Sequence, residues 1–234
     1  MKIGGIQRLT LLDYPGKVAC TVFTVGCNLR CPFCHNASLV THTQDAESYS
    51  VKELMEYLQK RKGMLDGVCI SGGEPLLQSD IEDVIRDIKA LGYSVKLDTN
   101  GTFPEKLGQL INKGLIDYVA MDVKNCEEKY AVTVGLDSID ISKIKKSISI
   151  LMEGKVDFEF RTTVVNELHT PSDIKKLACM ISGAEKYFIQ PFLHSPDLIF
   201  DGLSAVQTQD LVQMKQFSES FVESVKIRGV DTTS

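Results

Sequence analysis

Residues 27–36 read Cys-Asn-Leu-Arg-Cys-Pro-Phe-Cys-His-Asn and place Cys27, Cys31 and Cys34 within eight positions of the chain. Thiolates are soft ligands that are typical of iron–sulfur clusters and of zinc sites. Three of them on one short loop leave a fourth coordination position open, whereas a structural zinc site normally has four ligands. His35 stands directly beside Cys34, which is an awkward position for a fourth ligand. The pattern therefore favours an open-sited cluster over zinc.

Outward from this loop, short apolar strands alternate with amphipathic helices. Strands are expected at 18–25, 68–70, 95–97, 118–121, 158–165 and 187–189. Such alternation predicts a parallel sheet with right-handed crossovers, and six units are too few for a closed eight-fold barrel. We therefore expect an α/β fold, an open partial (β/α)6 barrel over residues 50–228. With an N-terminal hairpin and cysteine loop over residues 1–35, it would form a single domain spanning residues 1–234.

Local signals define several of these elements. The hairpin is expected to pair Leu9–Leu12 with the strand at 18–25 across an Asp13–Gly16 turn. Ser50 with Glu53, and Ser79 with Glu82, have the spacing of capping boxes, so each pair is expected to begin a helix.

Polar residues follow successive strands of the predicted sheet. Gly72-Gly73-Glu74 follows the strand at 68–70, Asp98-Thr99-Asn100 follows the next strand, and Asp122-Val123-Lys124 follows the one after it. In parallel α/β sheets, ligands bind outside the carboxyl ends of the strands. The sequence therefore predicts one site at that edge, shared with the cysteine loop.

Composition limits the classes of partner and compartment. The chain has 43% hydrophobic residues and a net charge of −5, which argues against nucleic acid or an anionic membrane as a partner. No apolar stretch resembles a signal peptide or approaches the length of a membrane span. Seven cysteines with local clustering fit a metal site in a reducing compartment better than a disulfide framework. A cytoplasmic location is expected.

The cysteine segment resembles the cluster motif of the radical S-adenosylmethionine (radical SAM) enzymes. Phe33 before the last cysteine and His35-Asn36 after it resemble the branch that activates glycyl-radical enzymes. The turn centred on Gly16, Ser71–Pro75, Asp98–Gly101 and Met121–Lys124 occur in the family order. The resemblance thus covers nearly the whole chain, and within the branch it is strongest to the short activating proteins of anaerobic ribonucleoside-triphosphate reductases.

This resemblance implies one 4Fe–4S cluster held by Cys27, Cys31 and Cys34, with S-adenosylmethionine bound at the open iron. Only Cys69 lies between Cys34 and Glu74, so further clusters are not expected. The implied activity is reductive cleavage of S-adenosylmethionine and formation of a glycyl radical on a partner enzyme. The implied partners are anaerobic ribonucleotide reductase and a flavodoxin- or ferredoxin-type reductant.

The resemblance also implies a set of cofactor-binding residues. They are Phe33, Cys34, His35, Gly72, Gly73, Glu74, Pro75, Asp98, Thr99, Asn100, Asp122, Val123, Lys124, Arg161 and His194. Gly72 and Gly73 would allow the backbone close to the cofactor, and the resemblance allows a monovalent cation between Asp98 and Asp122. Alternatives remain for some positions: Lys124 and Arg161 could form structural ion pairs, and the segment containing His194 is one residue longer than in formate-lyase activators.

Other functions are compatible with these residues. The protein could activate a different glycyl-radical enzyme, or it could act directly on a small molecule or peptide. A non-catalytic metal-binding module is the alternative of another class. Among residues outside the site, Cys20, Cys69, Cys126 and Cys179 are expected to be buried or incidental thiols. His42 and His169 are expected to be solvated.

Overall fold

The centre of the computed structural model, which describes residues 1–41 and 48–229, is an eight-stranded sheet whose strands follow chain order. β1 (Ile3–Thr10) pairs antiparallel with β2 (Ala19–Thr24), and each later neighbour is parallel. The later strands are β3 (Gly67–Gly72), β4 (Ser94–Thr99), β5 (Tyr118–Asp122), β6 (Asp157–Val164), β7 (Lys186–Pro191) and β8 (Ser224–Ile227). Within the described residues, β1 and β8 do not pair with each other, so the barrel is open.

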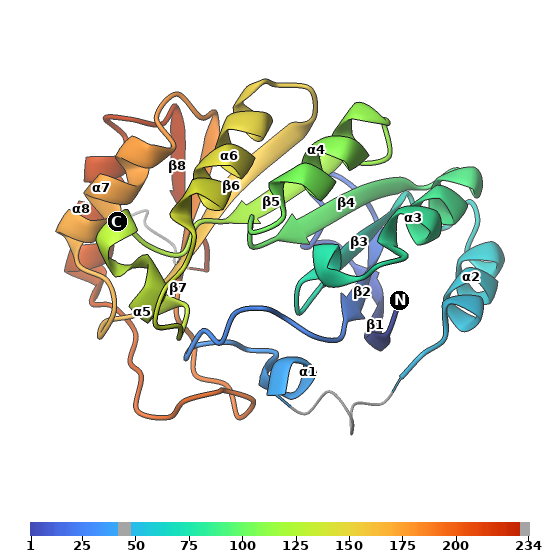
Figure 1. Ribbon diagram of the computed structural model, residues 1–234, viewed down its shortest axis with the longest axis horizontal. Coiled ribbons are helices and arrows are strands. Elements are labelled where there is room, and N and C mark those ends of the chain that lie inside the picture. The colour runs from blue at the N-terminus through green and yellow to red at the C-terminus, as the bar shows by residue number, and fades with distance from the viewer. Residues whose placement is uncertain (42–47, 230–234) are drawn as a thin grey trace.

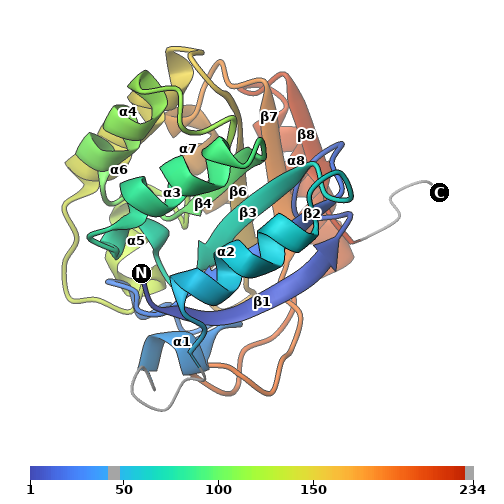
Figure 2. The ribbon, with the colours of Figure 1, turned by 90° about the vertical axis from the view of Figure 1, so that its right-hand side faces the viewer.

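Helices cover the outer, convex face of the curved sheet (Figures 1 and 2). They are α2 (Val51–Lys60), α3 (Ile81–Ala90), α4 (Pro104–Asn112), α6 (Ile141–Met152), α7 (Pro171–Met180) and α8 (Thr208–Ser218), with the short α1 (Ala37–Thr41), α5 (Tyr130–Thr133), η1 (Pro75–Leu77) and η2 (Glu127–Lys129) nearer the strand ends. In α3, Val84, Ile85 and Ile88 recur at helical spacing and are all buried, which fixes that helix on the sheet. None of the described helices has the length and apolar character needed to cross a membrane.

The expected partial barrel and N-terminal hairpin are confirmed, with differences in detail. β1 begins at Ile3 rather than Leu9. The Ser50–Glu53 capping box is present, but the Ser79–Glu82 box is wrong. α3 begins after Asp80, whose carboxylate contacts the amino group of Met1 instead of capping the helix. The sheet also contains β8, which the sequence did not predict.

Candidate functional site

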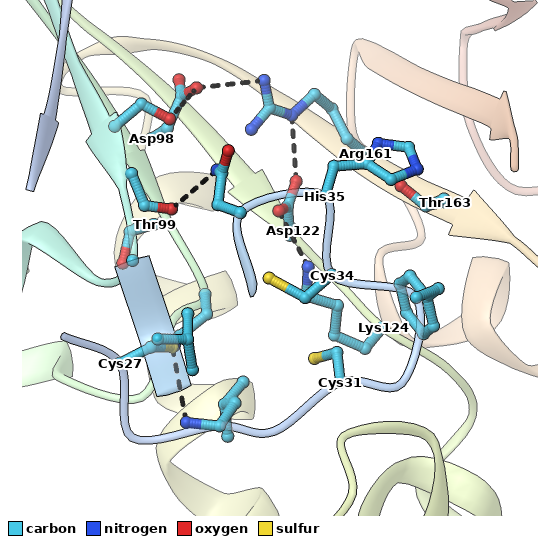
Figure 3. A pocket seen from close by; sticks show the side chains of 18 of the residues that line it. Cys27, Cys31, Cys34, His35, Asp98, Thr99, Asp122, Lys124, Arg161 and Thr163 are labelled. Carbon is cyan, nitrogen blue, oxygen red and sulfur yellow. Dashed lines mark hydrogen bonds and ion pairs between the residues drawn. The ribbon is translucent and has the colours of Figure 1, made fainter. Parts of the chain in front are cut away.

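A cavity of about 410 Å³ lies at the carboxyl ends of the parallel strands. Most of the predicted site residues line it: Cys27, Cys31, Phe33, Cys34, His35, Gly72, Gly73, Asp98, Thr99, Asn100, Asp122, Lys124 and Arg161. Figure 3 shows the thiols on one side of this space and the charged side chains of β4, β5 and β6 opposite them. The structure thus brings together residues that the sequence separates by more than a hundred positions.

The loop that carries the three cysteines is fixed by contacts from distant parts of the chain. The Arg30 amide donates to the Val134 carbonyl at 2.9 Å, and the Phe200 amide donates to the Pro32 carbonyl at 3.1 Å. The ring of His35 forms a hydrogen bond with the Leu193 carbonyl at 2.8 Å through Nε2. These bonds fix the loop against segments that are far away in the sequence.

The three thiols share one buried environment. Burial raises the pKa of Cys31 to about 12 and also raises the pKa values of Cys27 and Cys34. Cys27 and Cys34 raise the pKa of Cys31 further by charge repulsion, while Lys124 opposes them. Ligand binding must therefore displace protons from these sulfurs.

The donor set fits a 4Fe–4S cluster. Each thiolate of such a cluster binds a different iron, so the sulfurs surround a volume rather than a single point. No three His, Cys, Asp or Glu side chains of the described segments are arranged to hold one metal ion. Three thiols facing one cavity, together with cationic and carboxylate groups across it, are suited to a cluster that leaves one iron for a small charged ligand.

A ladder of alternating charges crosses the cavity wall. Lys124 Nζ lies 2.9 Å from an Asp122 oxygen, and Arg161 Nε lies 3.0 Å from the other. Arg161 also reaches Asp98 at 3.4 Å, and Asp98 pairs with the buried Lys96. Burial alone would raise the pKa of Asp122, but the Arg161 and Lys124 cations hold it below its usual value. Burial opposes ionisation of Asp98 as well, but Arg161 and Lys96 hold the pKa of Asp98 below its usual value. Both carboxylates of the ladder are therefore ionised.

The expected monovalent cation does not fit this arrangement. Asp98 accepts from Lys96 with one oxygen and from Ser71 Oγ and Arg161 with the other. Asp122 accepts from Arg161 with one oxygen and from Lys124 with the other. Each of the four carboxylate oxygens already accepts from a donor, and Lys96, Lys124 and Arg161 are among these donors. A cation between the aspartates would therefore have to share oxygens with three positively charged side chains.

The glycines at the end of β3 bring two backbones together. The Gly73 amide donates to the Thr24 carbonyl at 2.9 Å, and the Glu74 amide donates to the Gly26 carbonyl at 2.8 Å. A Cβ on Gly73 would lie 2.0 Å from the Gly26 oxygen. Gly72 has φ of 112°, which L side chains rarely adopt. These glycines therefore allow the end of β3 to pack against the start of the cysteine loop. The sequence analysis had expected them to let the backbone come close to the cofactor.

Glu74 lies beneath the cavity rather than in it. Its fully buried carboxylate accepts from Thr99 Oγ1 at 2.9 Å, from the Asn100 amide at 2.8 Å and from the Leu76 amide at 3.0 Å. Burial raises the pKa of Glu74 to about 7 despite these bonds. Glu74 thus positions the loop after β4. Pro75 and Val123 are also buried and do not line the cavity.

The four histidines differ from expectation in part. His194 is exposed and is not among the cavity-lining residues. His169 was expected to be solvated, which is wrong: it is buried, and its Nε2 forms a 2.8 Å hydrogen bond with the Lys124 carbonyl. The residues that follow it, Thr170–Asp173, are mostly polar, and only the fold shows that His169 packs against Phe33 and the loop after β5. His42 lies outside the described residues.

Of the remaining cysteines, Cys20, Cys69 and Cys126 are buried and Cys179 is exposed, and none of the four lines the cavity. The cavity is also lined by residues that the sequence did not assign to the binding site: Asp13, Leu29, Asn36, Val40, Ser71, Thr163 and Gln190. Thr163 lies inside an expected strand, and Ser71 and Gln190 lie one residue beyond the expected ends of theirs, so extending the alternate inward positions along each strand would have found them.

Comparisons with known proteins agree with this geometry. The family model of the Radical SAM superfamily matches residues 21–178. A Methanocaldococcus jannaschii protein named as a glycyl-radical enzyme activating enzyme is 34% identical, over 99% of this chain and 97% of its own length. A pyruvate formate-lyase-activating enzyme of Clostridium pasteurianum is 30% identical, over 82% of each chain.

Among solved structures, Streptococcus suis SuiB bound to S-adenosylmethionine superposes with a TM-score of 0.67 at 15% identity. The match covers 89% of this chain and 52% of SuiB, so this chain spans about half of that protein's length. The likeness shows a shared fold. Together with the family match over most of the sequence, it leads to one conclusion: this chain belongs to the radical SAM superfamily, in its glycyl-radical-enzyme activating branch, an enzyme family that uses a 4Fe–4S cluster and S-adenosylmethionine.

Proposed function

We propose that this protein is a cytoplasmic activase that reductively cleaves S-adenosylmethionine and generates a glycyl radical on anaerobic ribonucleoside-triphosphate reductase. The observation that carries the proposal is the convergence of three thiols and a charged ladder on one cavity. A cluster bound there supplies one-electron reduction of the cofactor, and a flavodoxin- or ferredoxin-type protein supplies the electron.

Each part of the cavity has a role in this proposal. Cys27, Cys31 and Cys34 hold the cluster. Lys124 and Arg161 attract the carboxylate of S-adenosylmethionine, and the ionised Asp122 between them keeps both cations aimed at the cavity. These fixed charges would orient the cofactor without reorganising the site.

Further residues complete the binding site. Asp98, Thr99 and Asn100 offer a carboxylate, a hydroxyl and an amide to the ribose. Phe33 packs beside Lys124, whose Nζ lies 5.9 Å from the ring centroid, and so shields that ion pair from water. His194 is not included in this assignment, because its side chain is exposed.

A protein substrate suits the edge of the cavity. The segment after β7 runs beside the cysteine loop and carries two exposed apolar side chains, Leu193 at 70% and Phe200 at 61% exposure. His35 and Pro32 bond directly to this segment, so a glycine-bearing loop docked on it would be held close to the thiols. The choice of the reductase rests on the Cys34-His35-Asn36 form of the motif, whereas the similarity to formate-lyase activators favours pyruvate formate-lyase as the second candidate.

Electron paramagnetic resonance tests the activase proposal. Anaerobically reconstituted protein, reduced and mixed with S-adenosylmethionine and the reductase, is expected to give a glycyl-radical doublet and ribonucleotide reduction. A reductase whose radical glycine is alanine is the matched control and should give no doublet. If 5′-deoxyadenosine forms but only pyruvate formate-lyase gives the doublet, the named partner is wrong while the chemistry stands.

Asn100 is expected to tune the cluster, because its Nδ2 donates to Cys27 Sγ at 3.8 Å. A hydrogen bond to sulfur stabilises the more negative, reduced cluster. If the bond contributes about 1 kcal/mol, its loss in Asn100→Leu should lower the reduction potential by about 40 mV. Potentiometric titration followed by electron paramagnetic resonance measures this shift.

Thr102→Val is the control for this prediction. It removes the 2.6 Å hydrogen bond from Thr102 Oγ1 to Asn100 Oδ1 without touching a sulfur, so the potential should stay close to that of the unmodified protein. An unchanged or higher potential in Asn100→Leu would contradict the assigned role.

A further inference from the structure

Lys96 is a buried lysine in the middle of the sheet. It lies on β4 between Val95 and Leu97, and its side chain is only 1% exposed. Residues 96 and 98 point to the same face of the strand, so the ammonium pairs with Asp98, and it lies 3.8 Å from Cys69 Sγ. Burying an ammonium costs several kcal/mol unless it is paired, so the buried Lys96 ammonium requires the Asp98 carboxylate. The same ion pair orients Asp98.

The two carboxylates around Asp98 are neutralised without a metal ion. Three cations, Lys96, Lys124 and Arg161, face the two carboxylates Asp98 and Asp122, so the ladder carries a net charge of 3 − 2 = +1. This excess suits the carboxylate of S-adenosylmethionine. A monovalent cation would raise the net charge to +2 in a buried space and would require oxygen ligands that already accept hydrogen bonds.

We propose that the Lys96 ammonium permanently supplies the positive charge that a bound Na⁺ or K⁺ would otherwise supply beside Asp98. Cofactor binding then requires no monovalent cation. A tethered charge loses no translational freedom when the cofactor binds, whereas a recruited ion does. The inference concerns cofactor binding alone, so its failure would leave the proposed partner and radical transfer untouched.

The dependence of S-adenosylmethionine binding on monovalent cations, measured on the cluster-loaded protein, tests this inference. The dissociation constant of S-adenosylmethionine is measured anaerobically by calorimetry in K⁺, Na⁺ and tetramethylammonium salts at equal ionic strength. Tetramethylammonium is too large to occupy a site between two carboxylates. Because linkage is reciprocal, an enzyme that takes up a cation with its cofactor must bind that cofactor more weakly in tetramethylammonium. We expect the three values to agree within about twofold.

Lys96→Met should make cofactor binding depend on a monovalent cation, a dependence that we expect the unmodified protein to lack. Without the ammonium, the variant is expected to bind S-adenosylmethionine about tenfold more weakly in tetramethylammonium and to recover most of the affinity in K⁺. If the role of Lys96 were purely structural, the Lys96→Met variant would bind S-adenosylmethionine more weakly in all three salts. Lys89→Met is the matched control, because Lys89 pairs with Asp117 at the opposite end of the strands, 2.8 Å away, and it should show no cation dependence.

Two results would overturn the inference. One is an unmodified protein whose affinity rises more than about fivefold in K⁺ over tetramethylammonium. The other is a folded, cluster-loaded Lys96→Met protein whose affinity is the same in all three salts. If Lys96→Met does not fold, the measurement on the unmodified protein decides the question, and Lys96→Gln, which keeps a polar donor, provides a second variant.

Discussion

A variant in which Cys27, Cys31 and Cys34 are all alanine is expected to bind no stoichiometric iron or sulfide after anaerobic reconstitution. The three thiols are the soft donors that face the cavity, and the other described cysteines do not line it. The fold should persist, because the loop is held by backbone hydrogen bonds from Val134 and Phe200 rather than by its sulfurs. Iron and sulfide analysis measures the loss, and circular dichroism verifies the fold.

Two single variants serve as controls for the triple alanine protein. Cys20→Ala removes a thiol buried in the sheet, and Cys179→Ala removes an exposed thiol. Both should load a full cluster, although Cys20→Ala should cost some stability through the small cavity it leaves. A triple variant that still binds four irons would show that the cluster, and with it the proposed chemistry, lies elsewhere.

Gly73→Ala is expected to lower both stability and cluster loading. The new methyl group would lie 2.0 Å from the Gly26 oxygen and 2.6 Å from the Gly26 carbonyl carbon. Both are backbone atoms next to Cys27, so the strand end and the cysteine loop must separate. We expect a cost of about 3 kcal/mol, equivalent to a fall in Tm of roughly 10 °C. Thermal unfolding and iron content of the reconstituted protein are the measurements.

Gly5→Ala is the matched control, because a Cβ there would meet Phe23 at 3.6 Å, an ordinary van der Waals contact. It should change Tm little and load iron fully. A Gly73→Ala protein with unaltered Tm and weaker cofactor binding would instead support direct contact between this glycine and the cofactor, as the sequence alone had suggested.

Much of the fold and of the site could be predicted from local patterns. The Ser50–Glu53 box begins a helix because its two hydrogen bonds involve residues three apart. The cysteines, Asp98 and Asp122 converge because the carboxyl ends of parallel strands share one edge, which follows from the strand–helix alternation alone. The sequence therefore located the site before any distance was known.

Other features depend on contacts that no local pattern carries. Lys96 reads as an ordinary strand residue. Its spacing to Asp98 is local, but the contact of Asp98 with Arg161, which links Lys96 to the rest of the ladder, depends on how β4 and β6 are placed in the sheet. Glu74 was placed at the cofactor because its motif was recognisable, yet its carboxylate points down to the Asn100 amide. His169 lies in a polar stretch, and its burial follows only from the packing of the loops around Lys124.

The long-range fixation of the cysteine loop has a consequence for biosynthesis. Cys34 emerges early from the ribosome, but Leu193 and Phe200, which anchor the loop, are made some 160 residues later. At ~5–20 residues per second, the nascent chain carries its three thiols without their final supports for roughly ten to thirty seconds. The complete cysteine loop, and with it the expected cluster site, therefore forms only after most of the chain has been made.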